Sequence, residues 1–273
     1  MEAEEHVRAG RLKEALAELQ ARVRKQPADA KLRVFLFQLL AVLGQWDRAL
    51  TQLQVAGELD PSALAMVQTY REALRCELLR REVFAGHRSP VVFGEPAEWM
   101  ALLVQALKLG ADGKLEEAQA LRDRAFAAAP TTPGEIDDRR FEWLADADPR
   151  LGPMLEAIVN GRYAWIPFHR LSRIELEKPS DLRDLVWTAA NLTFENGGQS
   201  VALIPTRYPG FEAVEDPRLA MSRATEWRER PFGLFEGIGQ RVLTTDQGEH
   251  ALLDTRVISL DRVPGQTAGD ESR

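Results

Sequence analysis

The feature that most constrains the fold is a pattern that occurs three times in the first half of the chain. In each copy a glycine is followed two positions later by a large apolar residue and five positions later by an alanine, and a proline stands 17 positions after the glycine. The copies run from Gly10 to Pro27, from Gly44 to Pro61 and from Gly113 to Pro130. Three copies with one spacing indicate a repeated structural unit.

Each conserved position of this unit has a physical role. Glycine tolerates positive φ, so it can end one helix and turn the chain into the next. The large residue begins the second helix, and the small Ala15, Ala49 and Ala118 allow the two helices to approach closely. Proline cannot continue a helix and closes the unit. Because the first two copies lie 34 residues apart, the first half resembles tetratricopeptide repeats.

The stretch between the second and third copies is less regular. Apolar residues at helical spacing predict one long helix over Pro61–Ala85. A run rich in glycine and proline, Gly86–Pro96, predicts a loop, and Glu98–Leu109 is again typical of a helix. We therefore predict a helical repeat domain over residues 1–135, with an irregular array whose ends must be capped.

After Pro130 the chain changes character, because glycine and proline interrupt it often. Short apolar runs between these breakers predict strands, whereas residues 151–160 are expected to form a helix. The predicted strands are Arg162–Phe168, Asp184–Leu192, Ser200–Pro205, Gln240–Thr245 and Ala251–Leu260. Residues 136–273 are thus expected to form an α+β domain with a mostly antiparallel sheet, ending in a frayed polar tail over Gly265–Arg273.

Composition and motifs argue against several classes of function. The formal net charge of −7 does not favour a nucleic-acid surface, and no apolar run is long enough to cross a membrane. The four histidines lack metal-ligand spacing, and the single cysteine, Cys76, is expected to be a packed helical thiol. Phosphate-binding and nucleophile motifs are missing, so we expect no metal, no cofactor and a cytoplasmic location.

The candidates for an alternative, enzymatic function are Asp146, Asp148 and Arg207. Two carboxylates two positions apart could serve acid–base chemistry in a hydrolase or transferase. The pattern Asp148-Pro149 favours a different role, in which Asp148 caps a helix that begins at Pro149. An enzyme would need an open pocket on which these polar groups converge.

A set of short motifs, in a fixed order from about residue 9 to residue 260, resembles the ImpE/TagJ family. The motifs are Leu36–Leu40, Gly44–Ala49, Val83–Gly86, Phe141 with Trp143, Asp146–Asp148, Arg150–Pro153, Glu156, Trp165–Phe168, Leu182–Asp184 with Trp187, Ile204–Pro209 and Thr225–Trp227. Proteins of this family are accessory components of the bacterial type VI secretion system.

The resemblance implies a non-catalytic adaptor in the cytoplasm. Its expected partner is the small subunit of the contractile sheath, bound through the N-terminal segment of that subunit, and a second expected partner is the ClpV unfoldase. A scaffold or chaperone for sheath assembly is a further alternative. The bound segment could be a helix lying in a groove of the repeats or an extended strand added to a sheet edge.

If the repeats follow tetratricopeptide geometry, the first helix of each pair lines the concave face. In the second unit this helix is expected over Ala30–Leu43, with Leu36, Phe37 and Leu40 packed inside. The residues that would then face the partner are Lys31, Val34, Gln38 and Ala41. The alternative is that the C-terminal half covers this face and the partner binds elsewhere.

Overall fold

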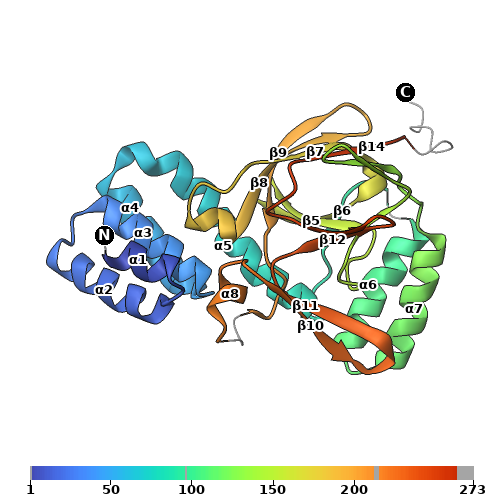
Figure 1. Ribbon diagram of the computed structural model, residues 1–273, viewed down its shortest axis with the longest axis horizontal. Helices are drawn as coiled ribbons and strands as arrows, with labels where there is room; N and C mark the ends of the chain where they lie inside the picture. The colour runs from blue at the N-terminus through green and yellow to red at the C-terminus, as the bar shows by residue number, and fades with distance from the viewer. Residues whose placement is uncertain (1, 96, 212–214, 263–273) are drawn as a thin grey trace.

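The computed structural model describes residues 2–95, 97–211 and 215–262. The first half is helical, as predicted (Figure 1). Its helices are α1 (Glu2–Arg8), α2 (Leu12–Lys25), α3 (Ala30–Val42), α4 (Trp46–Leu59), α5 (Leu64–Phe84), α6 (Glu98–Ala111) and α7 (Leu115–Ala128). The predicted long helix over Pro61–Ala85 is α5 preceded by a 3-10 turn at Pro61–Ala63.

The repeated glycines turn the chain as the sequence predicts. Gly10, Gly44 and Gly113 have φ angles of 74°, 67° and 81°, and each is followed by a helix that begins at the predicted large residue. Ala15 and Ala49 are completely buried, and Ala118 is 1% exposed. The turns at the glycines are therefore confirmed and the alanines are buried, whereas close helix approach at the alanines and tetratricopeptide packing geometry stay predictions.

The second half is built on strands. They are β2 (Gly134–Ile136), β3 (Arg139–Phe141), β4 (Leu144–Asp146), β5 (Met154–Val159), β6 (Arg162–Pro167), β7 (Leu171–Leu176), β8 (Trp187–Phe194), β9 (Gln199–Pro205), β10 (Thr225–Arg230), β11 (Leu234–Gly239), β12 (Val242–Thr245), β13 (Gly248–Ala251) and β14 (Val257–Leu260). A short helix, α8 (Pro217–Ala220), precedes β10. The fold class is α+β, as expected.

Most of these strands form one nine-stranded sheet in the order β1-β6-β5-β9-β8-β7-β14-β2-β3. Its pairings are antiparallel except for β1 (Val91–Val92), which runs parallel to β6. A three-stranded sheet, β13-β12-β4, and the hairpin β10-β11 complete the described strands. β1 lies within the predicted loop Gly86–Pro96, so the helical half also contributes a strand to the sheet.

Two of the sequence expectations for the second half are wrong. The helix expected over residues 151–160 is β5, which is buried along its whole length between β6 and β9. A fully buried strand carries a continuous apolar run, which periodicity alone does not distinguish from a short helix. The strand expected over Ala251–Leu260 is two strands, β13 and β14, separated by a turn.

The helical half and the sheet share a hydrophobic core. One continuous cluster of buried side chains includes Leu39 and Trp46 from the helices and Trp165 and Trp187 from the sheet. In Figure 1, α5 runs from the N-terminal helices toward the strands, and α6 and α7 flank the strands at the far end. Helices give way to strands between Ala128 and Gly134, close to the expected boundary, but the division into two domains stays a prediction.

Three further expectations concern the C-terminal tail, membrane-spanning helices and Cys76. The predicted frayed tail, Gly265–Arg273, lies outside the described residues. Over the part of the chain that is described, none of the helices combines the length and apolar character needed to cross a membrane. Cys76 is buried on α5, with its thiol 3.5 Å from the carbonyl oxygen of Gly161, which confirms the packed helical thiol.

Candidate protein-binding site

A network of buried charges joins the helical half to the sheet. Glu156 on β5 is completely buried and accepts a hydrogen bond of 2.6 Å from Nε of Arg80 on α5. Arg241, which precedes β12, pairs with both Glu156 and Asp146. The hydroxyl of Tyr163 on β6 also donates to Glu156. A buried ion is stable only when its partners replace water, and each of these carboxylates has at least two such partners.

The network shifts the pKa values of Glu156 and Asp146 in opposite directions. Burial acts to raise the pKa of Glu156, but Arg80 and Arg241 outweigh it and lower that pKa to about 2. Burial raises the pKa of Asp146 to about 6, against the opposing effect of Arg241. The difference has a geometric cause, because Glu156 lies between two guanidinium groups and Asp146 is paired with one.

Arg207 anchors the sheet side of the molecule to the end of α3. Its guanidinium donates to the carbonyl oxygens of Ala41 (3.1 Å), Val42 (2.6 Å) and Ala220 (2.5 Å). The carbonyls at the C-terminal end of a helix lack intrahelical partners and carry partial negative charge, so a cation is stabilised there. Arg207 therefore has a structural role between the two halves.

The three candidates for an enzymatic function do not meet in an open pocket. Asp146 is 3% exposed, Asp148 is fully buried, and Arg207 is 2% exposed. The carboxylate of Asp148 accepts from the guanidinium of Arg150 and from the backbone N–H of Gly237. Asp148 does cap the backbone that follows it, but this backbone forms a tight turn over Asp148–Gly152, so the expected helix cap is wrong.

The sequence-predicted binding face on α3 is only partly accessible. Lys31 is exposed and Val34 is half-buried, whereas Gln38 is 9% exposed and Ala41 is completely buried. The carbonyl of Ala41 is bonded to Arg207, so the C-terminal half covers this end of the face. A partner can reach Lys31 and Val34 directly but not the whole stripe, and partner binding at these residues stays a prediction.

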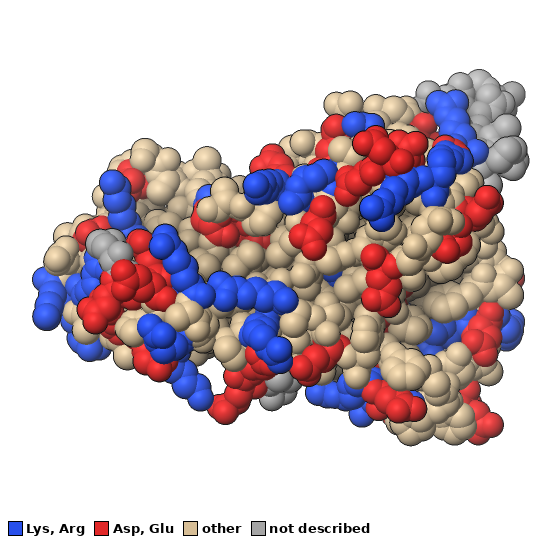
Figure 2. Space-filling view, viewed as in Figure 1, with Lys and Arg blue, Asp and Glu red and all other residues tan. Residues whose placement is uncertain are grey.

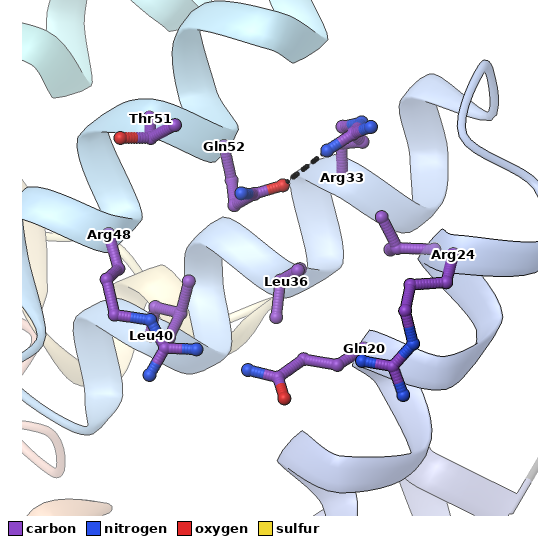
Figure 3. Close-up of a pocket in the computed structure, with 9 residues that line it drawn as sticks. Gln20, Arg24, Arg33, Leu36, Leu40, Arg48, Thr51 and Gln52 are labelled. Carbon is purple, nitrogen blue, oxygen red and sulfur yellow. Dashed lines mark hydrogen bonds between the residues drawn. The ribbon is translucent and has the colours of Figure 1, made fainter.

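The opposite side of α3 opens into a groove between α2 and α4, which we call the arginine groove (Figure 3). Its volume is about 260 Å³. It is lined by Gln20, Val23, Arg24, Arg33, Leu36, Leu40, Arg48, Thr51 and Gln52. Leu36 and Leu40, which the sequence correctly places on the packed side of the helix, form its floor together with Val23. Figure 3 shows Arg48 on one side of this floor and Arg24 with Gln20 on the other.

The arginines of this groove lack acidic partners. None of the lining residues is Asp or Glu. Arg33 donates to the amide oxygen of Gln52 at 2.8 Å and to the carbonyl of Pro27, and Arg48 donates to Gln45. Within residues 2–95, 97–211 and 215–262, Arg24, Arg33 and Arg48 form no ion pair with a carboxylate. The groove is therefore locally positive on a chain whose formal net charge is −7.

The sequence alone does not predict this groove, because analogy with a concave repeat surface places the exposed stripe on the Lys31 side of α3. A signal was present, since Arg33, Leu36 and Leu40 recur at helical spacing on the other side of the helix. The arginines from α2 and α4 are brought to this stripe only by the packing of the three helices. Figure 2 shows basic and acidic side chains interspersed over one face of the molecule, without a broad basic area.

One group of side chains in the described part of the chain has the composition of a metal site. Ligand atoms of Glu2, His6 and Glu18 lie within 4.8 Å of one another near the surface. Nδ1 of His6 accepts a hydrogen bond of 3.0 Å from Arg11, and Nε2 lies 3.9 Å from Glu18. These groups already interact among themselves, and we assign no metal to them.

Comparison with known proteins places the chain in a family. The family model described as "ImpE protein" matches residues 138–259. The type VI secretion system accessory component TagJ of Pseudomonas aeruginosa is 59% identical over 261 residues, which cover 96% of this chain and 92% of that protein. The chain therefore belongs to the ImpE/TagJ family of type VI secretion accessory proteins, as its motifs indicate.

The fold also occurs in a solved structure. The crystal structure of protein VPA1032 from Vibrio parahaemolyticus matches with a TM-score of 0.88 and 21% sequence identity. The match covers 97% of this chain and 99% of the other. At this identity the likeness concerns the fold alone, and it extends over both the helical half and the sheet.

Proposed function

We propose that this chain is a non-catalytic adaptor of the type VI secretion system that acts in the cytoplasm. It binds the N-terminal segment of the small sheath subunit and connects the sheath to the ClpV unfoldase. The observation that carries this proposal is the 59% identity, over nearly the whole chain, to a type VI accessory component.

The distribution of polar groups supports a binding role. The buried charged residues Arg80, Asp146, Glu156 and Arg241 are bonded to one another across the two halves, which is what a stable scaffold requires. The arginine groove, in contrast, presents charged groups that are available to a partner. A helical scaffold with an accessible groove between its helices suits the capture of a peptide segment.

The test compares two forms of the sheath small subunit with the full chain described here. We expect co-elution in size-exclusion chromatography with the complete subunit and none with a subunit that lacks its N-terminal segment. Equal binding of both forms would place recognition elsewhere in the subunit, and binding of neither would refute the proposal.

The link to the unfoldase needs its own measurement. The measurement compares how much ClpV is retained on two supports. We expect the immobilised sheath subunit with this chain bound to retain more ClpV than the immobilised sheath subunit alone. If the chain adds nothing to unfoldase retention, it is a scaffold for the sheath and not an adaptor to ClpV.

A further inference from the structure

We propose that the arginine groove binds an acidic amphipathic helix, whose apolar side chains reach Leu36 and Leu40 while its carboxylates pair with the surrounding arginines. This inference rests on the proposed function in that it names the chemistry of the peptide an adaptor would capture. It differs from the sequence expectation, which placed the partner on the Lys31 side of α3.

The shape of the groove favours side-chain recognition by a helix. Its floor is apolar and is formed by Leu36 and Leu40 of α3 with Val23 of α2, while the polar lining residues of α2 and α4 supply the walls (Figure 3). All nine lining residues lie on helices, whose backbone groups are bonded internally. An extended peptide would therefore find no strand edge with which to pair in this groove. A helix, which satisfies its own backbone, can place one or two apolar side chains on the floor.

The charges of the groove select the partner. Arg24, Arg33 and Arg48 come from three different helices, so positive charge lies on both sides of the floor. Arg24 and Arg48 are exposed and remain hydrated until a carboxylate arrives. A partner with acidic residues on both flanks of an apolar stripe complements this arrangement, and a basic partner is repelled. The formal net charge of −7 adds to this preference, because acidic peptides are repelled on average by the rest of the chain.

The experiment uses two synthetic helical peptides of about 18 residues, or five turns, with the same leucine stripe. One carries glutamates on both flanks of the stripe and the other carries lysines. Titrated into the full chain at low salt, the glutamate peptide is expected to bind at least about tenfold more tightly, with a preference that falls as salt rises.

A matched pair of variants locates the binding. Arg24→Glu with Arg48→Glu changes the groove, whereas Lys25→Glu with Lys31→Glu makes the same change in net charge at exposed positions outside it. All four side chains are exposed, so both variants are expected to fold, which circular dichroism checks. We expect the groove variant to reverse the preference toward the lysine peptide and the control variant to keep it.

The outcomes separate this inference from the proposed function. If both variants lose the preference equally, or if the groove variant keeps it, the inference is overturned. If the control variant alone loses it, the site lies on the Lys31 face and the inference is again overturned. If the glutamate peptide behaves as expected but the N-terminal segment of the sheath subunit does not bind, the proposed function fails and the chemistry of the groove stands.

Discussion

Arginine side chains have different roles in two regions of this molecule. Between the helices and the sheet, Arg80, Arg207 and Arg241 are at most 3% exposed and donate to carboxylates or to backbone carbonyls. On the outer side of the helical half, Arg24 and Arg48 are exposed beside an apolar floor. Among the described residues, none of the carboxylates pairs with these two.

The two groups of arginines differ because water supplies hydrogen-bond partners to an exposed guanidinium but not to a buried one. A guanidinium removed from water needs protein partners, and Arg80 finds its carboxylate 76 positions away along the chain, in Glu156. Such pairs can form only in the folded molecule, so they fix the position of α5 on the sheet. An exposed guanidinium keeps its hydration and contributes little to folding, so it is free to recognise a partner. We therefore expect the inner arginines to determine stability and the outer ones to determine binding.

The largest effect is expected for Arg241→Met. The substitution leaves Asp146 without its guanidinium and Glu156 with only one, in a fully buried place. Breaking a buried ion pair on one side costs about 3–5 kcal/mol, which urea unfolding measures as a lower midpoint at unchanged slope.

The control for this prediction removes the stranded charge as well. Combining Arg241→Met with Asp146→Asn should recover part of the loss, because the two side chains interact directly. If Arg241→Met costs less than about 1 kcal/mol, the buried network is not what holds the halves together.

The next largest effect is expected on the stability of the chain at acidic pH. The pKa of Glu156 is about 2 in the folded chain and 4.5 ordinarily, so the unfolded chain binds the proton more readily. Its contribution, on the order of 3 kcal/mol, is present above pH 4.5 and is lost as the pH falls toward 2. In Glu156→Gln the free energy of unfolding should therefore fall less steeply over this range, as urea titrations at several pH values can show. Equal slopes for the two proteins would contradict the assignment.

A smaller loss of stability is expected for a substitution at Ala49, on one of the helices that line the arginine groove. Ala49 is completely buried on α4, one residue after Arg48, and its counterparts in the other repeats are equally small. Ala49→Leu should overpack the contact between α3 and α4 and destabilise the chain by about 1–3 kcal/mol. Ala65→Leu, at an exposed position of α5, is a control expected to have little effect. An unchanged melting midpoint for Ala49→Leu would show that close helix approach is not required here.

The helical half was predictable from sequence because its signals are local. Gly10, Gly44 and Gly113 predict turns at positive φ, and a helix begins two residues after each of them. In the second half, the sequence predicts a helix where β5 lies, because the buried apolar run of β5 has no period that distinguishes a strand from a helix. The adjoining turn at Asp148 also resembles a helix start, since a capping aspartate followed by proline fits either structure.

The sites depend on contacts that a single sequence does not reveal. The Arg80–Glu156 pair joins residues that lie far apart in the chain, and only the fold shows that both are buried. Only the fold shows, too, that the C-terminal half covers this end of the expected face, where Gln38 and Ala41 are buried. Lys31 and Val34 remain as the accessible part of that face. The spacing of the glycines predicts where the helices of this half begin, but it carries no information about what packs against them.

The smallest effect on folding is expected for Arg48→Ala, and it provides the sharpest separation of the two classes of arginine. Arg48 is exposed on α4 and bonds Gln45 three residues earlier, an interaction that water readily replaces. Its removal should change the free energy of unfolding by less than about 0.5 kcal/mol. The affinity for an acidic helical peptide should nevertheless fall, because one of the charges beside the groove is lost. Lys31→Ala, at a position that is also exposed and lies on the other side of α3, is the matched control and should change neither quantity. If Arg48→Ala lowers stability as much as the change at Arg241, then outer and inner arginines do not differ in role. If affinity is unchanged while Lys31→Ala weakens it, recognition belongs to the face first expected from the sequence.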